Sequence, residues 1–164
     1  MPKQIVFAVV IFLHDLFTVV WIGGLLTLGL IVLPATRRAL GMGPQTQQLM
    51  DAIQRRLRVP VYISIVGLVA TGLLLARRSP AFQGLFVFGT PYGTVLSLKH
   101  VLTLLMVAVT LLRSVALPRI DLAGPSRQRL KAALLFLNVA LGVLVLLLSG
   151  FSAALSAGGP PPAG

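Results

Sequence analysis

The fold is decided by an uninterrupted apolar run at residues 132–155, which reads AALLFLNVALGVLVLLLSGFSAAL. The run contains no charged residue. It exceeds the roughly 20 residues that an α-helix needs to cross a hydrocarbon core about 30 Å thick. Because a backbone in lipid must satisfy its own hydrogen bonds, this run predicts a membrane-spanning helix.

Three earlier apolar stretches, at about 5–33, 59–76 and 95–117, predict three further spanning helices. The chain is 57% hydrophobic and 10% charged, whereas soluble domains carry about 25% charged residues. We therefore expect an all-α, polytopic membrane protein, with a four-helix bundle over residues 1–157 in contact with the lipid bilayer. The Gly- and Pro-rich tail at 158–164 is expected to be disordered.

The net charge is +11, and its distribution predicts the topology. The connections at 34–58 and 118–131 hold nine basic residues, against three for the N-terminus and the connection after the second stretch. The positive-inside rule places the two basic connections in the cytoplasm and both termini outside, as in a bacterial inner membrane. It also explains the charge without nucleic-acid binding. Residues 45–58 are expected to form an amphipathic helix on the headgroups.

Ionisable groups inside a span usually face the bundle interior or water. His14 and His100 are predicted at a similar depth in the outer leaflet, and Asp15 could pair with Lys99. Imidazole suits copper and haem iron, and a thioether such as that of Met106 suits Cu(I). Because the chain has no cysteine, the ligands of a metal site would have to be His, Asp, Met, Asn or backbone groups. Each histidine could instead only form a hydrogen bond to a neighbouring helix.

Helical spacing places five side chains on one stripe of the third span: Lys99, Thr103, Met106, Thr110 and Arg113. The stripe could line a ligand path, but hydrogen bonding between helices, with Lys and Arg reaching toward opposite surfaces, is the favoured interpretation. Asn138 in the fourth span is expected to bond across helices. The many glycines of the spans are expected to let helices pack closely.

At these residues the chain resembles the copper resistance D (CopD) membrane family. His14, followed by Trp21-Ile-Gly-Gly24 and Leu33-Pro34, is similar to the opening of that family. Thr90-Pro-Tyr92-Gly93, Lys99 and Arg113 resemble a later family segment, and Leu141-Gly142 resembles its last helix. Asn138 departs from the family pattern, which has an acidic residue at the start of that motif. The resemblance implies copper uptake or tolerance, with metal captured outside the cytoplasm, and a periplasmic copper-binding protein or other membrane subunits as partners.

Two alternatives stay open. A similarity to the HemJ-type protoporphyrinogen oxidase family implies haem b, with His14 as the haem ligand and Lys99 as a substrate-binding or catalytic residue. Two membrane imidazoles, His14 and His100, could also supply axial haem ligands. The chain could instead be an accessory subunit of a larger membrane complex. No nucleophile triad, phosphate loop or dinucleotide fingerprint is present, which favours a function without catalysis and leaves no catalytic residue to name.

Overall fold

The computed structural model describes residues 2–77, 84, 86, 88–120 and 124–157. Over these residues the chain is helical and contains no β-strand. Four helices of the described part are long and apolar enough to cross a membrane, which confirms the predicted all-α fold. The tail predicted to be disordered, 158–164, lies outside the described residues.

Each long helix is continuous, although two of them contain π-helical turns. The first consists of α1 (Pro2–Thr18), π-helical η1 (Val19–Gly23), α2 (Gly24–Leu26), π-helical η2 (Thr27–Val32) and α3 (Leu33–Leu40). The second is α4 (Pro44–Ala76). The third consists of α5 (Pro91–Leu111), π-helical η3 (Leu112–Ala116) and the 3₁₀ turn η4 (Leu117–Arg119), and the fourth is α6 (Gly124–Ala157).

Local sequence explains where two of these helices begin and where the first one ends. Gly41, with φ of 70°, follows α3 in the left-handed region, a conformation that glycine adopts without a steric penalty. Pro44 and Pro91 stand in the first turns of α4 and α5, where no backbone N–H is required. The Thr90 hydroxyl caps α5 by accepting a hydrogen bond of 3.0 Å from the Gly93 amide.

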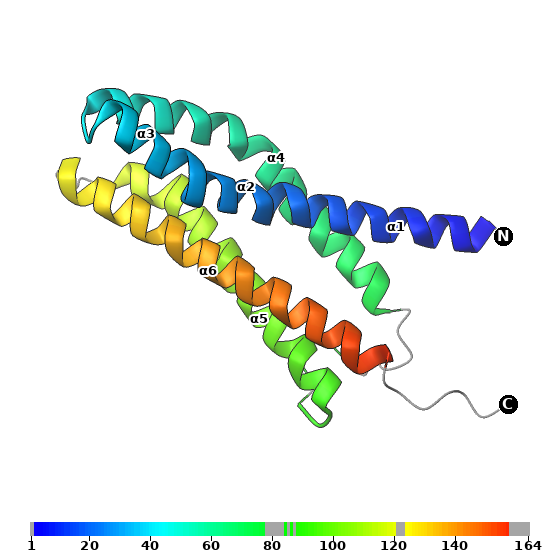
Figure 1. Cartoon of the computed structure of the whole chain (residues 1–164). Helices are drawn as coiled ribbons and strands as arrows, with labels where there is room; N and C mark the ends of the chain where they lie inside the picture. Colours follow the sequence, from blue (N-terminus) through cyan, green and yellow to red (C-terminus); the bar gives the residue numbers. More distant parts are fainter. Residues whose placement is uncertain (1, 78–83, 85, 87, 121–123, 158–164) are drawn as a thin grey trace, which may run out of the picture.

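The bundle consists of two antiparallel pairs, the first helix with α4 and α5 with α6 (Figure 1). The middle of the first helix joins the pairs by packing against α6. Two glycines allow this approach: a Cβ atom on Gly29 would lie 3.1 Å from Val139 Cγ2, and one on Gly142 would lie 3.1 Å from Ile22 Cγ2. The packing interpretation of the glycines is confirmed here, whereas Gly24 and Gly150 have no neighbour that their Cβ atoms would meet.

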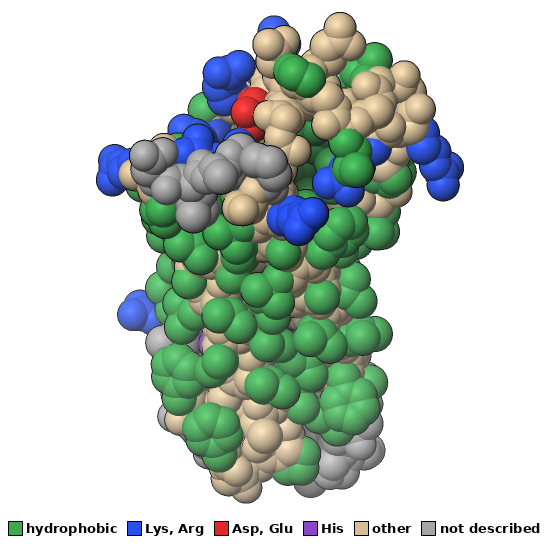
Figure 2. Space-filling model, turned by 90° about the vertical axis from the view of Figure 1, so that its left-hand side faces the viewer, with side chains coloured by type: hydrophobic (Ala, Val, Ile, Leu, Met, Phe, Trp, Pro, Cys, Tyr) green, Lys and Arg blue, Asp and Glu red, His purple; other side chains and the backbone are tan. Residues whose placement is uncertain are grey.

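The surface of the bundle is apolar, as a lipid-facing protein requires. Phe12, Val66 and Leu147 are each exposed over more than half of their surface, at 63%, 71% and 64%. Figure 2 shows hydrophobic side chains over most of the visible face, with most Lys and Arg side chains gathered toward one end. Because so much exposed apolar surface is stable only in lipid, the chain is an integral membrane protein.

The helices extend beyond the predicted spans, mostly at the end where α3 meets α4. The second span was predicted from residue 59 and the fourth from 132, yet α4 begins at Pro44 and α6 at Gly124. The predicted amphipathic segment 45–58 is helical, but it forms the first part of α4 instead of a separate helix. The reason is packing, since Thr46 and Met50 are buried and Asp51 binds Lys131 across to α6.

Candidate functional site

His14 is the predicted site residue with the most defined surroundings. Its Nδ1 atom lies 2.9 Å from the Thr71 hydroxyl, which joins α1 to α4. The Thr71 hydroxyl also donates a hydrogen bond of 2.7 Å to the Gly67 carbonyl oxygen of its own helix. A hydroxyl has a single proton, so a Thr71 hydroxyl that donates to Gly67 accepts from His14. In the neutral ring Nδ1 then carries the proton, and Nε2 keeps a lone pair that could bind a metal ion.

Small residues of α4 make room for this arrangement. A Cβ atom on Gly67 would overlap the ring of Phe17, and one on Gly72 would lie 3.6 Å from His14 Cε1. The α1 segment containing His14 and Phe17 therefore lies directly against the glycine face of α4. This close approach brings the Thr71 hydroxyl within hydrogen-bonding distance of the imidazole.

Lys99 and Asp15 lie toward the same end of the bundle as His14. Lys99, from α5, is close enough to both His14 and Asp15 to interact with them electrostatically. The predicted Asp15–Lys99 ion pair is not formed. Among the described residues, the ion pair is the one between Lys131 and Asp51. Asp15 is exposed on the bundle surface while Lys99 is half-buried, so the two charges interact only at longer range.

His100 follows Lys99 on α5, and its ring packs edge-on against Phe86 with 6.4 Å between ring centroids. In the part of the chain that the structure describes, no group of three or more His, Asp or Glu side chains could hold a metal ion. Tyr92, another predicted supporting residue, is half-buried in the first turn of α5.

The centre of the bundle is closely packed. Trp21, Met106 and Asn138 are each only 1% exposed. Asn138 Nδ2 donates a hydrogen bond of 2.8 Å to the Thr110 hydroxyl, which confirms the predicted bond across helices. Met106 lies against Gly142, where an added Cβ atom would be 3.4 Å from its Cε. Met106 and Thr110, in the middle of the predicted stripe, thus serve packing and hydrogen bonding. This agrees with the interpretation that the sequence favoured.

A cavity at the opposite end of the bundle was missed in the sequence. It has a volume of about 310 Å³ and lies between the middle of the first helix, α4, the α5–η3–η4 helix and α6. Five of the side chains around it are cationic: Arg55, Arg58, Arg113, Arg127 and Lys131. In the sequence these residues indicated only topology, because they come from three separate segments. The sequence offered one signal for this cavity. Arg55 and Arg58 are one helical turn apart, at the same end of the bundle as Arg113.

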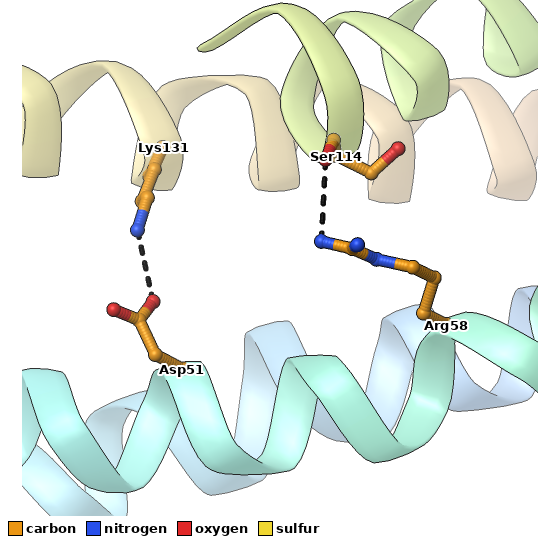
Figure 3. Close-up of polar contacts among 4 residues, drawn as sticks. All are labelled: Asp51, Arg58, Ser114 and Lys131. Carbon is orange, nitrogen blue, oxygen red and sulfur yellow. Dashed lines mark hydrogen bonds and ion pairs between the residues drawn. The ribbon is translucent and has the colours of Figure 1, made fainter. Parts of the chain in front are cut away.

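Polar contacts connect the elements around this cavity (Figure 3). Lys131 Nζ and Asp51 Oδ1 are 2.8 Å apart, and Arg58 Nη2 donates a hydrogen bond of 3.2 Å to the Ser114 carbonyl oxygen. The Tyr62 and Ser114 hydroxyl groups are also hydrogen-bonded, at 2.7 Å. These bonds join α4 to α6 and to η3, so the walls of the cavity are tied together.

Comparisons with known proteins found no matching family model, no similar curated protein and no similar solved structure. The resemblance to the CopD family therefore remains a prediction from the residues themselves.

Proposed function

We propose that this protein handles copper in a membrane, with His14 as the imidazole that captures the metal on the extracytoplasmic side. The observation that carries the proposal is the hydrogen-bond chain from His14 through Thr71 to Gly67. Metal-binding histidines usually donate their second ring N–H to a fixed acceptor, which sets the tautomer and the ring orientation. Thr71 is such an acceptor, and it leaves Nε2 of His14 available to copper.

The charge distribution supports the side on which capture would occur. The basic connections lie at the end of the bundle opposite to His14, and the positive-inside rule would place that end in the cytoplasm. His14 then lies in the outer half of a bacterial inner membrane, with both termini outside. A periplasmic copper-binding protein is the partner we propose for delivery. Met106, deeper in the bundle, would be the next soft ligand, which the metal could reach only if the packed helices separated.

Binding of Cu(I) to the purified protein in detergent tests this proposal. We expect His14→Ala to abolish binding, because it removes the metal ligand. Thr71→Val should weaken binding by about 10- to 100-fold, because it removes only the group that orients the imidazole. His100→Ala reports whether the second histidine contributes to the affinity.

The matched control is Thr103→Val. The Thr103 hydroxyl bonds the Lys99 carbonyl of its own helix at 2.8 Å, as Thr71 bonds Gly67, but it makes no bond to His14. Copper affinity should be unchanged in this variant. Unaltered stoichiometry and affinity in a His14→Ala, His100→Ala double variant would refute the copper proposal.

One observation favours haem b as the second candidate. Lys99 places a positive charge near His14, which opposes a bare cation there but would pair with a haem carboxylate. His14 would then be an axial ligand through Nε2. After expression with sufficient haem, this candidate predicts a Soret absorption band that His14→Ala removes. A purified wild-type protein with no such band excludes it.

A further inference from the structure

The cavity at the basic end of the bundle has a composition that points to an anionic ligand. Five cationic side chains surround it, and Asp51 is the acidic residue among its described lining. Asp51 is paired with Lys131, so the four arginines keep their charge uncompensated by it. Ordinary snorkelling explains arginines that reach outward to headgroups. It does not explain why four arginines converge on one cavity, where Arg113 and Arg127 are half-buried although Arg55 and Arg58 are exposed.

Hydrogen-bond donors remain available in this cavity. A guanidinium group has five N–H donors in a fixed planar arrangement. Arg113 Nη1 and Arg127 Nε are buried and make no hydrogen bond within the described part of the chain. Both residues line the cavity, one from η3 and one from α6. Because a buried charged donor without an acceptor is costly, these atoms indicate that an acceptor normally enters the space between them.

We propose that this cavity binds a phosphate group. Arginine forks pair with phosphate oxygens through parallel charge-assisted hydrogen bonds, and forks from three elements suit a group whose oxygens point in several directions. The volume of about 310 Å³ lies at the lower end of the range of small-molecule sites, which is about 300–1,000 Å³. A neighbouring cavity of about 210 Å³ shares Asp51, Gln54, Arg127 and Lys131 with it and provides room for the rest of a phosphorylated molecule.

The cavity is at a depth where membrane phosphates are found. Arg113 follows Lys99 by 14 residues on the same long helix, and Arg58 precedes Thr71, the partner of His14, by 13 residues on α4. At 1.5 Å per residue, each separation is roughly 20 Å. The basic end thus coincides with the opposite headgroup layer of a core about 30 Å thick. The Asp51 and Lys131 side chains are 46% and 27% exposed, so the cavity is reached from outside the bundle at this pair. A phospholipid headgroup and a free phosphate compound present the same chemistry here.

Titrations of the full-length protein in neutral detergent distinguish these sources. The probes are inorganic phosphate, short-chain phosphatidic acid and, as an uncharged control, short-chain diacylglycerol, with binding followed by calorimetry. Saturable binding of both phosphate probes supports a site for phosphate compounds in general. Binding of phosphatidic acid alone supports a lipid-headgroup site. Binding of neither probe, or equal binding of diacylglycerol, overturns the proposal.

Variants tie the binding to the cavity. Arg113→Gln should weaken phosphate binding by roughly tenfold or more, since it removes a charged donor. The control is Arg38→Gln, which removes the same charge from an exposed position at the same end of the bundle. Arg38 lies outside the described lining of both cavities, so phosphate affinity should change by less than about twofold. Equal losses in the two variants would show nonspecific charge attraction and overturn the proposal.

A second variant covers the case in which Arg113→Gln does not fold. Gly24 lines the cavity, and a Cβ atom there would meet nothing within 4 Å. Gly24→Leu should therefore fold and block phosphate binding by occupying the space, while Cu(I) binding at His14 stays unchanged. Phosphate affinity equal to that of the wild type in Gly24→Leu contradicts the site. Because Cu(I) binding is measured separately, a result that contradicts the phosphate site leaves the copper proposal untouched.

Discussion

Trp21→Ala is expected to destabilise the bundle by about 3–5 kcal/mol, the largest loss we expect from any single truncation. Trp21 is 1% exposed and lies in the core cluster with Ile22 and Met106. Removing the indole would leave a void that the surrounding helices can close only in part. Within a membrane, helices are held together mainly by such packing, because lipid offers apolar side chains as good an environment as the protein does.

Circular dichroism during unfolding in mixed micelles of increasing SDS content measures this loss, because the variant lacks the only tryptophan for fluorescence. The matched control is Phe12→Ala, which truncates an aromatic side chain of the same helix that is 63% exposed to lipid. Trp21→Phe should cost less than Trp21→Ala, because Trp21 Nε1 has no hydrogen-bond partner in the described structure and only volume is lost. A loss in Trp21→Ala no greater than in Phe12→Ala would contradict the packing argument.

Gly67→Ala is expected to force α1 and α4 apart. The added Cβ atom would overlap the Phe17 ring, so either the ring or the helix must move. Overpacking of this kind typically costs about 1–3 kcal/mol. Because Thr71 is one turn from Gly67, the bond between Thr71 and His14 should lengthen or break. Copper affinity and stability are therefore both expected to fall.

A double-mutant cycle with Phe17→Ala isolates this clash. Removing the ring creates space for the new methyl group, so the double variant should be more stable than the sum of the single changes predicts. Gly150→Ala is the control, since its Cβ atom would meet nothing within 4 Å. Strict additivity of Gly67→Ala and Phe17→Ala would show that the two side chains do not compete for the same space.

The candidate sites were predicted unequally well. His14 and Lys99 were identified because a charged or imidazole side chain in an apolar run is unusual wherever it points. The bond across helices made by Asn138 was predictable for the same reason, since a buried amide in lipid needs a partner. The partner itself, Thr110, is a matter of helix register, and the Thr71 acceptor of His14 lies 57 residues away in the chain. Helical spacing within a segment carries no information about such distant neighbours.

The amino-acid sequence by itself determined that this chain forms four apolar helices, because a long uncharged run has no stable alternative to a helix in lipid. It also determined which connections are basic. Tertiary structure alone decided how far the helices continue past the apolar runs, that Asp15 and Lys99 stay apart, and that arginines from three segments surround one cavity. These features depend on rotation and register between helices, which packing at residues such as Gly29, Gly67 and Gly142 sets and which no single segment encodes.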